Sequence, residues 1–286
     1  MEKLSPLASV SATQQVLEQF GLNTKKALGQ HFLINDGVVR KICDLADLNP
    51  QDDVLEVGPG IGTLTVALLQ LAGRVVAIER DTDLPAVLEQ TCEPWSDTFT
   101  LISGDALEVA PEDLPFAPHK FVANLPYAVA ATIVLDYFER YPSLQTATVM
   151  VQAEVAARMA AKPSAKDYGA YTAKLALLAH SAGQFGVSES NFFPPPRVKS
   201  TVIKLERNAE SIEKPLMEAT FTMADAAFAT RRKTIANSMK TYFKAHPEKF
   251  DSGNVDALLE RAGIDPRVRA EALEPTAFIT LAQASL

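Results

Sequence analysis

Residues 53–63 read DVLEVGPGIGT, and this segment indicates the fold. It begins with an apolar run typical of a buried strand, and three glycines follow before a helical pattern opens. In open α/β sheets, ligands bind at the carboxyl ends of the strands, where a glycine-rich turn lets the backbone approach them closely. We therefore expect residues 53–63 to form a strand, a ligand-binding loop and the start of a helix.

The alternation of strands and helices continues along the chain. Short β-branched runs predict strands at 53–58, 74–79, 99–105, 121–125, 146–152 and 201–206. Amphipathic patterns predict helices before and between them, at 37–47, 64–71, 83–91, 128–138 and 154–161. This order is typical of an α/β fold with a doubly wound, Rossmann-like sheet.

The pattern changes after residue 207, where no further strand is indicated. Helices are expected at 216–228, 233–244, 255–262 and 276–284. We therefore divide the chain into an N-terminal extension (1–24), an α/β domain (25–207) and a small all-helical C-terminal domain (208–286).

Composition and charge narrow the class of protein. The 286 residues are 47% apolar, no run approaches the length of a membrane span, and the N-terminus lacks the apolar core of a signal peptide, so a cytoplasmic protein is expected. Cys43 and Cys92 stand too far apart in sequence to suggest a disulfide framework or a zinc site, and no metal is expected.

The charge is distributed unevenly along the chain. The net charge of −8 argues against nucleic-acid binding, yet residues 81–113 hold nine acids and no Lys or Arg, whereas 231–249 hold six basic residues and one acid. The net charge therefore does not represent the charge of any one face of the protein.

The glycine loop indicates the kind of ligand. Its spacing is GxGxG, and Thr63 stands where a dinucleotide-binding loop has its last glycine. Glu56, just ahead of the loop, suits an amino-acid moiety, although it can equally cap backbone amides. Glu79 and Asp105 end the next two predicted strands, where they can accept hydrogen bonds from ribose hydroxyls and from an adenine amino group. An adenosine joined to an amino acid is S-adenosylmethionine, which we expect as the cofactor.

A second motif, Asn124-Leu125-Pro126-Tyr127, follows the fourth predicted strand on the same edge. The Asn124 side-chain carbonyl and the Leu125 backbone carbonyl can accept both N–H groups of an adenine amine, which favours its pyramidal, nucleophilic form. Pro126 fixes the chain, and Tyr127 offers a ring for the base to stack on. The alternative is a strand-terminating turn with a core tyrosine.

These motifs together resemble the small-subunit ribosomal RNA adenine dimethyltransferase A family, from about residue 25 to 237. The resemblance implies a class I S-adenosylmethionine-dependent methyltransferase that acts as a monomer on 16S rRNA in immature 30S subunits. It would place two methyl groups on N6 of each of two adjacent adenines in the 3′-terminal hairpin. The segments that carry the resemblance are 28–33, 55–65, 79–81, 104–106, 124–127, 152–159, 167–169, 192–200 and 228–237.

The resemblance also assigns roles to individual residues. It implies cofactor contacts for His31, Leu33, Gly58, Gly60, Glu79, Asp105 and Asn124. Position 31 departs from the pattern, which usually reads Asn. Phe192 is implied as a second aromatic face opposite Tyr127, unless the segment that it opens is only a rigid linker. RNA contacts are expected at Lys25, Lys26, Arg197, Lys199, Arg231, Arg232 and Lys233.

Three alternatives remain from the sequence. An NAD-dependent oxidoreductase shares the loop and Glu79, but it leaves Asn124 to Tyr127 unexplained. A large-subunit rRNA methyltransferase of the erythromycin-resistance type shares all the cofactor motifs, although the segment 192–200 and the helical tail favour the small subunit. A non-catalytic assembly factor does not need Asn124 and Tyr127.

Overall fold

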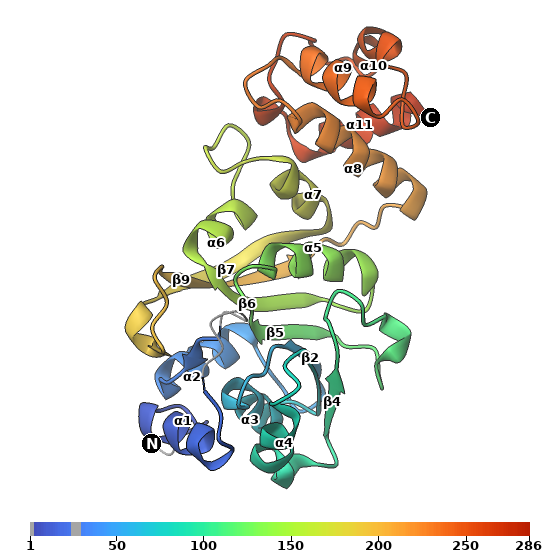
Figure 1. The fold of residues 1–286 in the computed structure, drawn as a ribbon. Coiled ribbons are helices and arrows are strands. Elements are labelled where there is room, and N and C mark those ends of the chain that lie inside the picture. The colour runs from blue at the N-terminus through green and yellow to red at the C-terminus, as the bar shows by residue number, and fades with distance from the viewer. Residues whose placement is uncertain (1–2, 24–29) are drawn as a thin grey trace. The chain divides into compact units, whose positions relative to one another are not determined.

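The structure is a computed structural model that describes residues 3–23 and 30–286 (Figure 1). The chain forms two compact units. The first unit comprises Met1–Ala156 and Ser181–Arg207, and the second comprises Ala157–His180 and Asn208–Leu286. The second unit thus includes a segment, Ala157–His180, that lies ahead of the boundary near Asn208 placed from the sequence.

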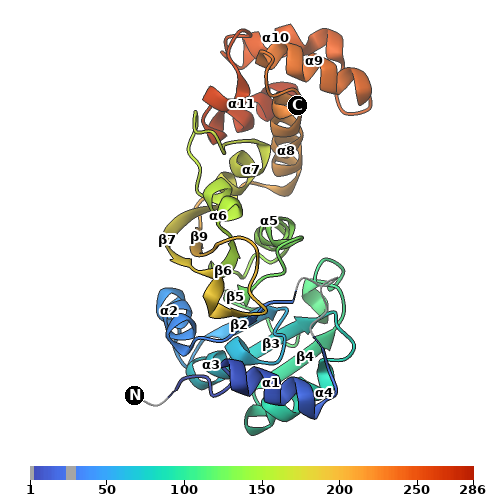
Figure 2. The same ribbon diagram turned by 60° about the vertical axis from the view of Figure 1, so that its left-hand side comes forward.

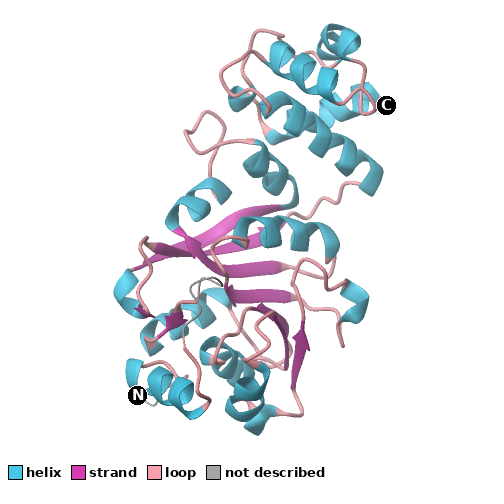
Figure 3. Ribbon diagram, in the orientation of Figure 1, coloured by secondary structure: helices cyan, strands magenta, loops and turns pink. Residues whose placement is uncertain are grey.

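A seven-stranded sheet forms the centre of the first unit (Figure 3), in the order β4-β3-β2-β5-β6-β9-β7. Neighbouring strands from β4 to β6 are parallel, and β9 runs antiparallel to β6. The bounds are β2 Asp53–Val57, β3 Arg74–Glu79, β4 Phe99–Ser103, β5 Lys120–Asn124, β6 Thr146–Gln152, β7 Ala179–Val187 and β9 Ser200–Arg207. The six predicted strands and the α/β class are confirmed, while β7 was missed because most of its residues are polar or small and exposed.

Helices cover both faces of this sheet (Figure 2). Successive side chains of a strand point to opposite faces. On β5, Phe121 packs against Tyr137 of α5, with ring centroids 4.9 Å apart, whereas Val122 joins the core formed with α2, α3 and α4. The helices are α2 Asp36–Ala46, α3 Thr63–Leu71, α4 Pro85–Thr91, α5 Ala130–Arg140 and α6 Ala153–Met159.

Two further features position the N-terminal part of the first unit. Helix α1, Val10–Gln19, begins at an N-cap where the Ser9 hydroxyl accepts a hydrogen bond from the Ala12 amide, and Leu17 is buried in the core that contains α2. A two-residue strand, β1 (Phe32–Leu33), pairs antiparallel with β8 (Phe192–Phe193). Chain segments about 160 residues apart are thereby joined beside the sheet.

The second unit is helical. Its helices are α7 Ala170–Leu178, α8 Lys214–Phe228, α9 Ile235–Ala245, α10 Val255–Arg261 and α11 Pro275–Ser285. Tyr168 is buried among them, packs edge-on against Phe228 and donates a hydrogen bond to the Leu273 carbonyl at 2.9 Å. The segment ahead of α7 is therefore part of this unit's core.

Within residues 3–23 and 30–286, none of the helices is long and apolar enough to cross a membrane. In the same residues, no three His, Cys, Asp or Glu side chains gather where they would hold a metal ion.

Candidate active site

A cavity of about 540 Å³ opens at the carboxyl ends of β2, β3 and β5 in the first unit. This size lies within the range of small-molecule sites. The lining includes every residue predicted to contact the cofactor and the whole acceptor motif: His31, Leu33, Gly58, Gly60, Glu79, Asp105, Asn124, Leu125, Pro126 and Tyr127. The edge of the sheet predicted from the strand order thus carries the cavity.

Two positions in the loop after β2 require glycine because of their backbone conformation and the atoms around them. Gly60 has φ +62°, and a Cβ there would meet the Phe32 ring at 3.2 Å. Gly62 has φ +90°, and a Cβ there would lie 2.9 Å from the Thr91 hydroxyl oxygen. Both conformations are strained for any residue with a side chain. The loop therefore requires glycine at both positions to pass close to the cavity and lead into α3.

Glu79, the last residue of β3, presents a carboxylate that the backbone already orients. One oxygen accepts from the Asp81 amide at 2.7 Å and the other from the Gly60 amide at 3.4 Å. The side chain is 7% exposed, and burial raises the pKa of Glu79. Each carboxylate oxygen keeps a lone pair for a further donor, such as a pair of hydroxyl groups.

Glu56 is the most deeply buried ionisable group that lines the cavity, at 1% exposed. Desolvation raises its pKa to about 8, and the nearby Glu79 carboxylate adds to the rise. Its Oε2 atom has no hydrogen-bond partner among the residues that the structure describes. A buried carboxyl oxygen without a partner is costly, and a cationic ligand group is suited to pair with it.

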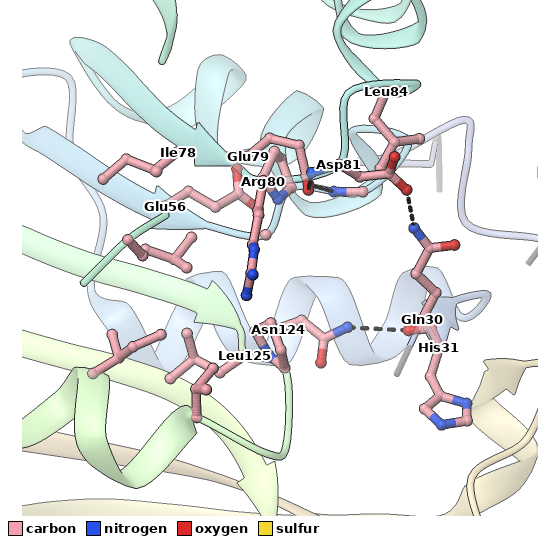
Figure 4. Close-up of a pocket in the computed structure, with 18 of the residues that line it drawn as sticks. Gln30, His31, Glu56, Ile78, Glu79, Arg80, Asp81, Leu84, Asn124 and Leu125 are labelled. Carbon is pink, nitrogen blue, oxygen red and sulfur yellow. Dashed lines mark hydrogen bonds between the residues drawn. The ribbon is translucent and has the colours of Figure 1, made fainter. Parts of the chain in front are cut away.

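Three residues given no role from the sequence also line the cavity (Figure 4). The Arg80 guanidinium lies 3.3 Å from Asp105 Oδ2, so it contacts the carboxylate predicted to hold an adenine. The Gln30 side-chain amide donates to Asp81 Oδ2 at 2.7 Å. Arg80 and Asp81 directly follow Glu79 in the sequence, and this adjacency is the signal that could have placed them at the cavity.

Asn124 ends β5 with its amide held in one orientation. Its Nδ2 donates to the His31 carbonyl at 3.2 Å, as Figure 4 shows. The neighbouring Leu125 amide donates to the Met150 carbonyl of β6 at 3.1 Å. With the Asn124 NH₂ group engaged, its carbonyl oxygen is the atom that remains to accept a ligand hydrogen.

The aromatic residues are arranged differently from the expectation. Tyr127 lines the cavity, and its hydroxyl lies 2.6 Å from the Ser200 hydroxyl. Phe192, expected opposite Tyr127, is instead 2% exposed in the apolar core and does not line the cavity. The reason is the pairing of β8 with β1, which sets Phe192 beside Leu33. The expected pair of faces from Tyr127 and Phe192 is therefore not present in this structure.

The described basic residues that were predicted to contact RNA belong to both units. Arg197 and Lys199 are exposed between β8 and β9 of the first unit. In the second unit, the exposed residues 231–233 form the turn between α8 and α9, and the Arg231 guanidinium donates to the Lys166 carbonyl. Lys25 and Lys26 lie outside the described residues.

The fold and the position of its cavity define the chain as a class I methyltransferase. Residues 21–284 match the family described as Ribosomal RNA adenine dimethylase, and the chain belongs to that family. The Ribosomal RNA small subunit methyltransferase A of Rhodococcus opacus strain B4 is 38% identical over 283 residues, which cover 96% of this chain and 94% of the relative. Membership confirms the predicted family and enzyme class, an S-adenosylmethionine-dependent rRNA adenine dimethyltransferase.

Solved structures agree with this assignment. A dimethyladenosine transferase from Plasmodium falciparum has a TM-score of 0.74 at 25% identity, covering 88% of this chain and 96% of its own. The 23S rRNA methyltransferase ErmE has a TM-score of 0.63 at 26% identity, covering 89% and 99%. The fold is thus similar both to a dimethyladenosine transferase and to a 23S rRNA methyltransferase.

Proposed function

We propose that this protein transfers methyl groups from S-adenosylmethionine to N6 of two adjacent adenines in the 3′-terminal hairpin of 16S rRNA, dimethylating each. The substrate is the immature 30S subunit in the cytoplasm, and the enzyme acts as a monomer. The single observation that carries the reaction is the Asn124 amide, fixed by the His31 carbonyl at the same cavity as the cofactor residues.

The cavity fits the cofactor in its donor set. Glu56 offers an unpartnered buried oxygen to the ammonium group, and Glu79 offers two oriented oxygens to the ribose hydroxyls. Asp105 accepts from the adenine amine, and the backbone of Gly58 and Gly60 gives the amino-acid end close access. When bound, the cofactor supplies an electrophilic methyl group.

The acceptor motif prepares the adenine amine. The lone pair of that amine is delocalised into the ring, so the planar group is a poor nucleophile. Asn124 Oδ1 and the Leu125 carbonyl accept its two N–H groups in a geometry that favours a pyramidal nitrogen, and this stabilises the transition state more than the ground state. Tyr127 stacks on the base, and alignment of the amine nitrogen with the cofactor's methyl group supplies the rest of the rate acceleration.

The small subunit is favoured over the large subunit by the curated relative, which is named as a small-subunit methyltransferase over nearly its whole length. Arg197, Lys199 and the turn 231–233 offer exposed cations to RNA phosphates, and double-helical RNA is recognised largely through such contacts. The large-subunit activity remains the alternative because of the likeness to ErmE.

The test is methyl transfer from labelled cofactor to immature 30S subunits and, in parallel, to large-subunit RNA. Mapping of the modified bases should find dimethyladenine at two adjacent positions near the 3′ end of 16S rRNA. Labelling confined to large-subunit RNA would contradict the proposed substrate.

A further inference from the structure

The far end of the Tyr127 side chain is held by a buried serine. The Tyr127 hydroxyl lies 2.6 Å from the Ser200 hydroxyl, and either group can be the donor. Ser200 is 1% exposed and does not line the cavity, whereas Tyr127 does. A buried hydroxyl is costly unless it is hydrogen-bonded. The contact therefore joins a residue of the cavity wall to a buried residue outside the cavity.

This contact reaches across three neighbouring strands. Tyr127 follows β5, Ser200 is the first residue of β9, and β6 lies between these two strands in the sheet. On β6, Gln152 is the register partner of Ser200, and the Met150 carbonyl accepts from the Leu125 amide at 3.1 Å. The acceptor motif is thus fastened to β6 through its backbone and to β9 through the tyrosine ring.

We infer that Ser200 is a positioning residue that fixes the direction of the Tyr127 ring on which the target adenine stacks. This rests on the proposed function. The phenol hydroxyl lies on the long axis of the ring, so a hydrogen bond there fixes the direction of that axis, while Pro126 restricts the backbone that precedes it. Because the ring is fixed before the base arrives, less conformational entropy is lost when the base stacks.

The bond orients the ring and transfers no proton. Burial is the largest cause that raises the pKa of Tyr127 above its ordinary value of 10, so the phenol is protonated at neutral pH. The contact is therefore between two neutral hydroxyls, and its contribution is one of geometry. A ring that is turned away from its place would leave the adenine amine misaligned with Asn124 and with the methyl group.

The place of Ser200 in the chain links the ring to the RNA-contacting segment. Arg197 and Lys199, which are expected to contact RNA, lie just before Ser200 in the sequence and are exposed. The Lys199 carbonyl accepts from the Ala153 amide at 3.0 Å, so the backbone next to Ser200 is itself held in place. Residues 197–200 thus combine the proposed phosphate contacts with the anchor of the ring.

Substitutions at the two ends of the bond separate positioning from stability. Ser200→Ala and Tyr127→Phe break the same hydrogen bond, and the second keeps the aromatic ring, so their effects should not add. Tyr127→Ala removes the ring, and Ser200→Ala should then have no further effect on activity. A serine that only stabilised the fold would reduce activity by the same factor in every background.

A matched control removes a buried hydroxyl from the neighbouring strand. Thr148 of β6 is 0% exposed, and its hydroxyl oxygen has no hydrogen-bond partner among the residues that the structure describes. Thr148→Val keeps the shape of the side chain and breaks no hydrogen bond. It should therefore retain wild-type activity.

The experiment measures kcat and KM for methyl transfer to immature 30S subunits at saturating S-adenosylmethionine, with the cofactor Kd from calorimetry and the melting temperature of each variant. Ser200→Ala, Tyr127→Phe and the double variant should each lose about 3- to 10-fold in kcat/KM, the range for one hydrogen bond. Tyr127→Ala should lose about 5- to 100-fold, the range for one base stack, with or without Ser200→Ala. The cofactor Kd should be the same in all variants.

Additive losses from Ser200→Ala and Tyr127→Phe would overturn the inference, as would an equal loss from Ser200→Ala when the ring is absent. A rise in the cofactor Kd of Ser200→Ala would overturn it too, because the serine would then act on the cofactor. Wild-type activity of Ser200→Ala beside an impaired Tyr127→Ala would refute the role of Ser200 and leave the stack intact. Full activity of Tyr127→Ala would instead contradict the stacking step of the proposed function, so the two failures are distinguishable.

Discussion

The Asn124 side chain donates a hydrogen bond to the His31 carbonyl across 93 residues of sequence, at 3.2 Å. This contact ties the end of β5 to the segment that leads into β1, and it decides which atom of the Asn124 amide remains available. His31 therefore orients the acceptor group through its backbone carbonyl, and its ring stacks against Tyr127 with the ring centroids 5.8 Å apart.

The first prediction separates cofactor binding from turnover. Asn124→Ala should leave the Kd for S-adenosylmethionine within about 3-fold and lower kcat by roughly 10² to 10³, as expected when one preorganised hydrogen-bonding group of a transition state is removed. Glu79→Ala should instead raise the cofactor Kd. The variant removes the carboxylate that accepts hydrogen bonds from two backbone amides and, as proposed, from the ribose hydroxyls. Calorimetry and single-turnover methyl transfer measure the two quantities. Equal loss of cofactor binding in both variants would contradict these roles.

Asn124→Asp provides the matched control for the orientation of this amide. It has nearly the same size, but an oxygen would face the His31 carbonyl, with no hydrogen to donate. We expect it to lose turnover as Asn124→Ala does.

The position of a site residue could be predicted where it follows from the order of the strands, and could not where it depends on pairing between distant segments. Glu79 and Asp105 were placed correctly at the cavity because parallel strands end at a common edge, so strand order alone brings them together. The burial of Phe192 was not predictable, since it depends on the β1–β8 pairing between distant segments. The same holds for the stacking of His31 on Tyr127. Strand β7 was missed for a different reason, because its exposed, polar sequence carries little of the apolar signal of a buried strand.

A second prediction follows from the raised pKa of Glu56, about 8 in the free protein. A cationic ligand group favours the carboxylate and lowers this pKa, so binding of S-adenosylmethionine at pH 7 should release up to about one proton. Affinity should then increase as the pH rises toward 8. Calorimetry in two buffers of different ionisation enthalpy measures the proton count, and Glu56→Gln should abolish it. No proton release in the wild type would mean that the ammonium group lies elsewhere.

The same pKa gives a prediction for stability. The pKa of Glu56 in the folded state lies above the ordinary value of 4.5, so its contribution is fully present below pH 4.5 and is lost as the pH rises through about 8. Glu56→Gln removes this dependence. Without cofactor, the melting temperature of the variant should exceed that of the wild type at pH 8.5 and match it near pH 4.5. The opposite order would place Glu56 in a stabilising ion pair.

The fourth prediction concerns the glycine loop. Gly62→Ala forces a side chain into φ +90° with its Cβ 2.9 Å from the Thr91 hydroxyl, which should lower the free energy of unfolding by about 1 to 3 kcal/mol. Gly186→Ala, in β7 of the same unit, is the control because no atom lies within 4 Å of its added Cβ. It should change stability by less than about 0.5 kcal/mol. Urea unfolding measures both, and equal effects would mean that the loop relaxes at no cost.

The last prediction concerns the RNA surface of the second unit. Reversing the charges of Arg231 and Arg232 to Glu should raise the apparent Kd for immature 30S subunits and leave the cofactor Kd unchanged, because these residues lie in the exposed α8–α9 turn. Lys214→Glu with Lys244→Glu is the matched control, since it makes the same change in net charge at exposed positions of the same helices. Each RNA phosphate that the protein no longer neutralises should reduce the slope of log Kd against log salt by about 0.7 to 0.9, so the Arg variant should change the slope by roughly 1.5. An equal effect of the Lys pair would mean that only the total charge matters, and the surface 231–233 would then have no specific role in RNA binding.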